Sequence, residues 1–558
     1  MERGTHEASA TPRDGRRPLG ALLVGSFALA LAIYWPSLPG TPISDDYGLL
    51  LNPWVMDLSG PRALELIDPR SQATLVLRNY APVRPLLQGL EWRWFGETAP
   101  AYHVVNLTVH AVASWLFALL LLQAGLPIAA AALAAAWLLM HPAAVEAVAW
   151  MSQIWGPLAL CFGIGALLAQ RRRPLAALAL FALALLTRPT AVCFLPAALL
   201  REWIWQRASG ASPRRWLPLL GWLLVFALVS AAELQVFRDS GAAAQSPLDP
   251  DAWVRARTAV AGIGRYAAMA ATGFGVAPFR EPPVARSWLD PWWLLGIAAA
   301  IAIAARSLFC LRRGREEVAF WAWAVAAFVP VSQIFPFLYP MADRYLYFIL
   351  PGLVGGVALA GRELLARLAE RDRRRLARAA TALVLAALAV FTLRSRERAA
   401  LWTSEERVLA DAALHSPDGV IFHLLRARSA ASQGDVDGAV AALEVCRARG
   451  WDYTGYLLAH PAFEPVRSTP PFQKLLGEFA EDRIERSAAR PRLSQLDLRD
   501  LAMAYRTRGR TDEAIAALER GIALGGPLDA ELRGELARLR AHPQPDAVAP
   551  GSEATDIP

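Results

Sequence analysis

The chain has 558 residues, 55% of them hydrophobic, and a formal net charge of +8 at pH 7. Its mean hydropathy of +0.30 excludes an ordinary soluble globular protein and indicates a membrane protein with several spans. The charge predicts no nucleic-acid partner, because the arginines cluster at the ends of apolar segments, as in cytoplasmic loops of membrane proteins. The four cysteines are scattered and predict no disulfide framework.

Several apolar segments approach or exceed the roughly 20 residues that cross about 30 Å of hydrocarbon, and we predict about eleven spans in all. The first follows a polar, arginine-rich segment, residues 1–17, and no signal-peptide cleavage site is evident behind it. We therefore expect an uncleaved anchor and a cytoplasmic N-terminus. The predicted spans are residues 18–38, 101–123, 127–141, 154–169, 174–187, 190–205, 216–235, 289–310, 317–337, 345–361 and 379–394.

Residues 252–279 are ambiguous, because this segment carries Arg255, Arg257 and Arg265. If it crossed the membrane, the basic loop at Arg312 and every later basic loop would lie outside the cytoplasm. We therefore predict an interfacial helix on the outer side. With this choice the C-terminal part of the chain also lies outside the cytoplasm.

Residues 395–545 lose the membrane composition and read as pairs of helices. Residues 498–526 fit the 34-residue tetratricopeptide (TPR) pattern. A weaker copy at 429–450 places Gly434 and Ala439 where the first has Gly509 and Ala514. We expect an all-α protein: a membrane bundle in residues 18–394 with an external loop at 39–100, a TPR-like domain at 395–545, and a disordered tail at 546–558.

Asp45 and Asp46 directly follow the first predicted span, at the water interface. Two adjacent carboxylates repel, so they favour a site that supplies a cation, a proton or a substrate dipole. The alternative is a solvated loop that ends the helix.

A polar stripe runs along the second predicted span. His103, Asn106 and His110 stand three and then four residues apart and therefore share one helical face. Such a stripe is costly within a membrane unless it faces a cavity or a partner. It predicts either interhelical hydrogen bonds or contact with a substrate or a metal.

His141 and Glu146 lie at the outer end of the third predicted span. They do not share a helix face, so they need not touch each other, but either could meet the aspartates across an outer cavity. The alternative is an interfacial helix that carries a stray acid.

Three arginines, Arg84, Arg188 and Arg344, fall at the same outer level of the predicted topology. The planar guanidinium group suits phosphate recognition. Each arginine alone is typical of an interface anchor, whereas three around one cavity predict a site for a lipid phosphate or diphosphate.

Several short motifs follow one another in a fixed order: DDYGLL, NYAPVRPLL, AYHVVNLTVHA, HPAAVEAVAW, LTRPT, ADRYLYF and then TPR-like repeats. In this order the chain resembles the transmembrane-and-TPR O-mannosyltransferase-like proteins and their bacterial relatives, which are integral-membrane glycosyltransferases of the GT-C type. The resemblance covers residues 18–360 and, in kind, the C-terminal repeats. Its departures are Thr187-Arg188-Pro189, where family members often carry a serine-lysine stretch, and the short repeat section.

The resemblance implies a transferase of a bacterial inner membrane that uses a polyprenyl-phosphate sugar and inverts the anomeric carbon. Asp45 or Asp46 would accept the proton of the acceptor hydroxyl, with Asp45 favoured. Arg344, next to Tyr345, would neutralise the leaving phosphate, with Arg84 or Arg188.

By the same resemblance, Glu146 and His141 would orient the acceptor or hold a divalent cation; no cofactor and no metal site is assigned. The acceptor would be a protein serine or threonine, or a glycan, and the repeats would present the acceptor or a protein partner. Two other readings are a non-enzymatic membrane scaffold whose repeats recruit envelope proteins, and a lipid-linked glycan polymerase or ligase.

Overall fold

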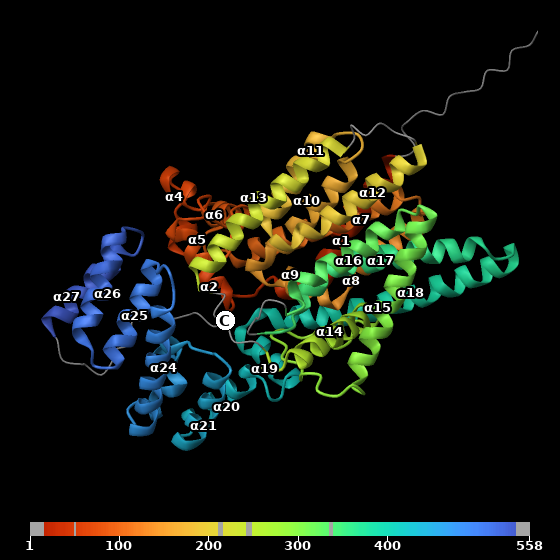
Figure 1. Cartoon of the computed structure of the whole chain (residues 1–558). Coiled ribbons are helices and arrows are strands. Elements are labelled where there is room, and N and C mark those ends of the chain that lie inside the picture. Colours follow the sequence, from red (N-terminus) through yellow and green to blue (C-terminus); the bar gives the residue numbers. More distant parts are fainter. Residues whose placement is uncertain (1–15, 50–51, 210–215, 242–247, 334–338, 543–558) are drawn as a thin grey trace, which may run out of the picture.

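A computed structural model describes residues 16–49, 52–209, 216–241, 248–333 and 339–542 (Figure 1). These residues form helices and their connections, and their one isolated β-bridge joins Arg280 to Met341, which confirms the predicted all-α class. The expected N-terminal segment, up to residue 15, and the expected tail at 546–558 lie outside the described residues.

Every predicted span coincides with a helix over most of its length. In chain order these are α1 (Arg16–Tyr34), α7 (Ala99–Gln123), α8 (Ile128–Met140), α10 (Trp155–Ala169), α11 (Pro174–Thr187), α12 (Phe194–Ser209), α13 (Leu217–Asp239), α15 (Pro291–Arg313), α16 (Glu317–Phe328), α17 (Asp343–Ala366) and α18 (Glu370–Ala399). Helix α18 runs through the domain boundary that was predicted after residue 394.

Seven helices in the described part are long and apolar enough to cross a membrane, or up to eight if α8 and the helix beyond its 53° bend form one span. Two shorter apolar helices, α11 and α16 with its extension, accompany them. A membrane protein is therefore supported, whereas the count of about eleven spans stays a prediction. The ambiguous segment forms α14 (Ala252–Thr272), which packs along α15.

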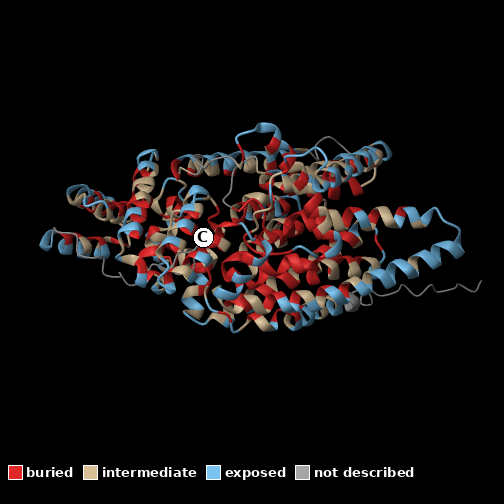
Figure 2. Ribbon diagram, turned by 90° about the horizontal axis from the view of Figure 1, so that it is seen from below, coloured by how far each residue is buried: buried red, intermediate tan, exposed pale blue. Residues whose placement is uncertain are grey.

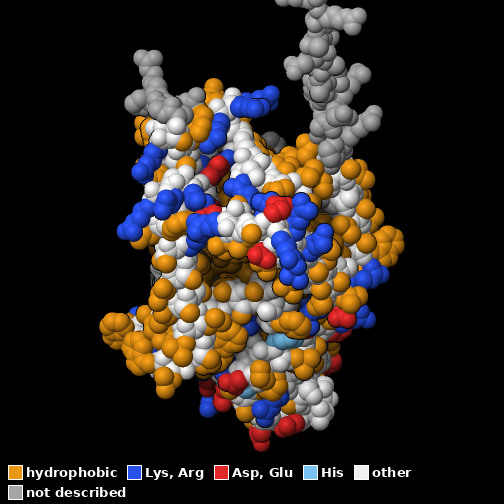
Figure 3. Space-filling model, turned by 90° about the vertical axis from the view of Figure 1, so that its right-hand side faces the viewer, with side chains coloured by type: hydrophobic (Ala, Val, Ile, Leu, Met, Phe, Trp, Pro, Cys, Tyr) orange, Lys and Arg blue, Asp and Glu red, His pale blue; other side chains and the backbone are white. Residues whose placement is uncertain are grey.

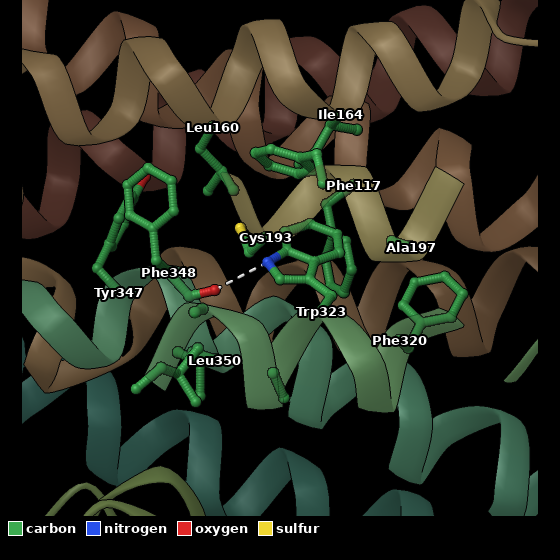
Figure 4. Packing of buried hydrophobic residues seen from close by; sticks show 14 of the residues in the cluster. Phe117, Leu160, Ile164, Cys193, Ala197, Phe320, Trp323, Tyr347, Phe348 and Leu350 are labelled. Carbon is green, nitrogen blue, oxygen red and sulfur yellow. Dashed lines mark hydrogen bonds between the residues drawn. The ribbon is translucent and has the colours of Figure 1, made fainter. Parts of the chain in front are cut away.

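The bundle is packed around aromatic side chains of α7, α12, α16 and α17 (Figure 4). Trp323 lies at its centre, fully buried, and its indole N–H donates to the carbonyl oxygen of Phe348 at 3.0 Å. The rings of Phe117 and Phe194 lie 6.5 and 4.7 Å from that of Trp323. Burying such large side chains dominates the stabilisation of a core.

Basic side chains gather at the end of the bundle where α17 turns into α18 (Figure 3). There Glu363 pairs with Arg306 and Arg315, each at 2.6 Å, and with Arg367. The turn itself projects beyond the buried core and is exposed (Figure 2). This end matches the basic side that the sequence predicts to face the cytoplasm.

The segment predicted as an external loop, residues 39–100, folds into short helices that lie at the opposite end of the bundle (Figure 1). They are α2 (Asp45–Leu49), α3 (Pro53–Met56), α4 (Gly60–Glu65), α5 (Gln72–Leu77) and α6 (Val83–Phe95). Asn52 caps α3 and Ser71 caps α5, each by accepting a backbone N–H with its side-chain oxygen.

The C-terminal helices follow α18 directly. They are α19 (Glu405–His415), α20 (Val420–Ser432), α21 (Val436–Ala448), α22 (Thr454–Ala459), α23 (Glu464–Arg467), α24 (Pro470–Ala488), α25 (Gln495–Thr507), α26 (Thr511–Leu524) and α27 (Asp529–Ala541). Gly434 and Gly509 both adopt left-handed φ angles, +75° and +71°, at the turn of their helix pairs. Ala439 and Ala514 are fully buried in both copies, as their match in the sequence predicts.

One hydrophobic core joins the end of the bundle that carries the short helices to α19–α24. Trp150 stacks on Trp402 with ring centroids 5.3 Å apart, and Phe279 lies edge-on to Trp150 at 5.9 Å. The C-terminal helices are therefore packed against the bundle rather than tethered by a linker.

Candidate functional site

Asp46 fastens the external loop to the bundle. Its carboxylate is 1% exposed and accepts the backbone N–H of Ile43 at 2.9 Å and that of Ser152 at 2.7 Å. Ser152 belongs to the 3-10 turn η3 (Met151–Ile154), which leads into α10. Burial raises the pKa of the Asp46 carboxyl to about 7, against the two N–H donors, which lower it.

Asp45 is half-buried beside it. Its negative charge raises the pKa of the Arg84 guanidinium, although burial, the larger effect, brings that pKa down to about 10. The two neighbouring aspartates therefore have different surroundings: Asp46 meets backbone N–H groups, and Asp45 lies in the field of an arginine.

The guanidinium groups of Arg84 and Arg188 both lie over the ring of Trp155. The guanidinium carbons lie 4.4 and 4.8 Å from the ring centroid of Trp155, which is cation–π distance. Arg188 also lies 5.1 Å from the ring of Phe348. Arg84 stands on α6 and Arg188 follows α11, so the tertiary fold joins two arginines about a hundred positions apart.

Arg344 is held by Glu146. Its backbone N–H donates to Glu146 Oε2 at 2.7 Å, and its guanidinium pairs with Glu146 Oε1. Glu146 belongs to α9 (Val145–Ala149), and the guanidinium carbon of Arg344 lies 5.5 Å from the ring of Trp150 and 5.2 Å from that of Tyr345. Glu146 thus fixes an arginine of this cluster.

Three buried N–H groups of the cluster are left without a hydrogen-bond partner among the described residues: Arg84 Nε, Arg84 Nη2 and Arg188 Nη1. The Arg84 and Arg188 side chains are 1% and 5% exposed. Leaving buried charged donors unpaired is costly. The arrangement therefore suits an anion whose oxygens would complete these bonds, and phosphate has the geometry that guanidinium groups prefer.

The residues of the polar stripe on α7 differ in their hydrogen bonds. His110 uses both ring nitrogens, with Tyr347 Oη at 2.7 Å and the Leu139 carbonyl at 3.1 Å. The Asn106 amide donates to the carbonyls of Trp150 and Met151 at 3.0 and 3.1 Å. For these two residues the geometry favours interhelical hydrogen bonding.

His103, at the outer end of the stripe, is buried, and neither ring nitrogen has a side-chain or backbone partner of good geometry among the described residues. It lies against Gly40, where an added Cβ would come within 3.1 Å of His103 Nε2. Gly40 therefore lets the loop pass close to this imidazole.

His141 lies at the bend after α8, and its ring contacts α14 and α18. It contacts the Met269 carbonyl at 3.2 Å and accepts the N–H of Ala143 at 3.1 Å. Its ring lies edge-on to Phe391. The described residues contain no group of three or more His, Cys, Asp or Glu side chains that could hold a metal ion, and Glu146 is paired with Arg344.

The sequence did not predict three further residues around the arginine cluster: Gln88, Glu91 and Trp155. Gln88 and Glu91 are buried on the same face of α6 as Arg84, four and seven positions on, a spacing that the sequence did display. The Gln88 amide donates to the Ser152 carbonyl at 3.3 Å. Both guanidinium groups lie over the ring of Trp155. Nothing in the sequence distinguishes this tryptophan as part of a site.

Comparison with known families finds one match: residues 497–539 fit the family described as Tetratricopeptide repeat. The matched segment spans α25, α26 and most of α27, and it confirms the predicted repeat. Comparisons of the chain with curated proteins and with solved structures give no match.

Proposed function

We propose that the protein is an integral-membrane glycosyltransferase of the GT-C type. It would transfer a sugar from a polyprenyl-phosphate donor to a hydroxyl of a protein or glycan acceptor on the non-cytoplasmic face. The observation that carries the proposal is a carboxylate, Asp45, in the field of a buried arginine cluster with unpaired N–H groups. A base beside an anion site is what transfer from a lipid phosphate requires.

In this mechanism the acceptor hydroxyl attacks the anomeric carbon opposite the phosphate, and its proton passes to the Asp45 carboxylate. The bond from the anomeric carbon to the phosphate oxygen breaks with its electron pair, so the configuration inverts. Arg84 and Arg188 would stabilise the charge that grows on the departing phosphate. The charge of Arg344 is already neutralised by Glu146. Arg344 would therefore limit the width of the site and position the rings of Tyr345 and Trp150.

The test is the substitution Asp45→Asn in the full chain, produced in a strain that lacks the native gene. We expect normal insertion and a loss of transfer of about 10²-fold or more, since a general base contributes about 10²–10⁴-fold. Mass spectrometry of envelope glycoproteins and glycolipids provides the readout. Asp57→Asn, an exposed aspartate on the same loop, is the matched control.

If Asp45→Asn inserts normally and leaves these glycans at wild-type levels, the enzyme proposal fails. The scaffold reading, which the TPR match also accommodates, would then be preferred.

A further inference from the structure

Four arginines form a row along the first turns of α18, directly after the exposed turn between α17 and α18. They are Arg371, Arg374, Arg375 and Arg378, and all four are exposed. Residues three, four and seven positions apart lie on one face of a helix, so these side chains project to the same side. They belong to the basic end of the bundle (Figure 3). We call them the arginine row.

Most of the arginine row has no partner in the protein. Arg374 pairs with Glu370 at 2.6 Å. Among the described residues, no hydrogen bond and no ion pair engages Arg371, Arg375 or Arg378. Like charges at these spacings repel one another along a helix. The protein therefore supplies too little negative charge to balance the row, and an anion from outside the chain would relieve the repulsion.

Arginines near the other end of α18 are engaged by the protein. Arg396 donates to the carbonyl oxygen of Ala32, and Arg398 pairs with Asp411 at 3.0 Å. Both ends of the same helix thus carry arginines, but those of the other end have partners. The lack of partners is therefore a property of the arginine row and not of every arginine on this helix.

The face that carries the arginine row continues along α18 as an apolar surface. Ala382, Leu385 and Ala389 follow Arg378 on this face at helical spacing, and all three are exposed. Leu388, on another face, is buried against the bundle. Helix α18 is among the helices long and apolar enough to cross a membrane. One face of it therefore presents positive charge and then an uncovered apolar surface.

A ligand that fits this face must carry a negative group next to a long apolar chain. A soluble phosphate or an acidic peptide would match the arginine row but would leave the apolar surface uncovered. A phospholipid with a net negative headgroup matches both parts, because its acyl chains run beside the helix below the headgroup. Guanidinium groups bind phosphate well, and basic clusters next to a membrane span attract anionic lipids.

We propose that the arginine row and the apolar face that follows it bind an anionic phospholipid of the leaflet at this end of the bundle. The headgroup contacts the arginine row, and an acyl chain lies along Ala382, Leu385 and Ala389. Because α18 leads through Trp402 into the core shared with the C-terminal helices, the lipid fixes the depth of that whole unit in the membrane. The inference is independent of the proposed function.

The experiment titrates phosphatidylglycerol into the full-length protein in detergent and measures the bound lipid by native mass spectrometry, with phosphatidylcholine as the neutral comparison. We expect phosphatidylglycerol to bind the wild type at least about tenfold more tightly. Each arginine near a membrane surface strengthens the binding of anionic lipid by about fivefold. Arg375→Gln should therefore raise the Kd by about fivefold, and Arg371→Gln, Arg375→Gln and Arg378→Gln together should raise it by about 10²-fold.

Two controls remove the same charge from other places. Arg373→Gln lies on a different face of α18 and should leave the Kd within about twofold of the wild-type value. Arg172→Gln, Arg173→Gln and Arg312→Gln together remove three exposed arginines from other helix connections and match the triple variant in charge. All these positions are exposed, so the melting temperatures should equal that of the wild type.

Equal affinity of the wild type for the two lipids overturns the inference, and so does an equal loss in the row variants and their controls, because net charge alone would then explain the binding. Displacement of the lipid by an equal concentration of glycerophosphoglycerol, which lacks acyl chains, also overturns it and assigns the row to a soluble phosphate. Displacement by hexaglutamate overturns it in favour of an acidic protein segment.

Discussion

At the scale of single residues, the neighbouring aspartates Asp45 and Asp46 have different roles. Asp46 accepts two backbone N–H groups, from Ile43 and from Ser152, which lies over a hundred positions away. Asp45 stays half-buried in the field of Arg84. We therefore assign Asp46 to the placement of the loop and reserve the proposed chemistry for Asp45.

These different roles predict that the same substitution changes the stability differently at the two positions. Asp46→Asn replaces one accepting oxygen by an NH₂ group that faces a backbone N–H, so one of the two bonds is lost. We expect the free energy of unfolding to fall by about 1–3 kcal/mol. Asp45→Asn should lower it by less, because Asp45 is half-buried whereas Asp46 is 1% exposed. Melting temperatures of both variants in nanodiscs provide the measurement, and equal losses would contradict the division.

The deficit of Asp46→Asn should also depend on pH. Burial raises the pKa of Asp46 to about 7 in the folded protein, whereas an aspartate in an unfolded chain ionises near about 3.9. Folding takes up a proton between these values, so the contribution of Asp46 to stability falls as the pH rises from about 4 to about 7. The deficit should therefore be largest at about pH 4 and below and constant above about pH 7; a deficit independent of pH would count against the buried carboxyl.

At the scale of elements, the loop between α14 and α15 is fastened to the C-terminal helices by Glu281. Its carboxylate accepts the first N–H of α20, from Val420, at 2.7 Å, and Arg449 lies 3.3 Å from it. Its own N–H donates to Ser416 Oγ at 3.1 Å. A carboxylate at a helix N-terminus satisfies N–H groups that the helix leaves open.

Glu281→Ala should loosen the C-terminal helices from the bundle. The change leaves the Val420 N–H and the Arg449 guanidinium without this acceptor, at a cost of about 1–3 kcal/mol. We expect faster trypsin cleavage between α18 and α21, followed by gel electrophoresis of the fragments. Glu519→Ala, which removes an exposed acid on α26 that pairs with Arg540, should not change the cleavage rate. Equal acceleration in both variants would show that Glu281 does not specifically hold the C-terminal helices to the bundle.

At the scale of the whole molecule, the bundle and the C-terminal helices share one core across the Trp150–Trp402 stack. Trp402→Ala should therefore destabilise both parts together, by about 3–5 kcal/mol. The expected result is one cooperative transition at a lower temperature, measured by near-UV circular dichroism and by tryptic digestion of both parts. Phe422→Ala, a partly buried ring on α20, should cost less. Two separate transitions would show that the parts fold independently.

The order of residues was enough to predict the helical segments and the polar motifs. Runs of apolar residues with basic ends located the predicted spans, and Gly434 and Gly509 marked the turns of the two helix pairs, because these signals depend on neighbours along the chain. The ordered motifs also identified Arg84 and Arg188 as candidates. Such local patterns do not say which distant segments meet.

The contacts between distant segments follow from the folded structure. It brought Arg84 and Arg188 to the same ring, that of Trp155, and it bound Asp46 to Ser152. It also separated His141 from Glu146, although they are close in sequence. The physical reason is that these contacts come from side-chain packing between helices, and packing depends on shape and burial across the whole fold.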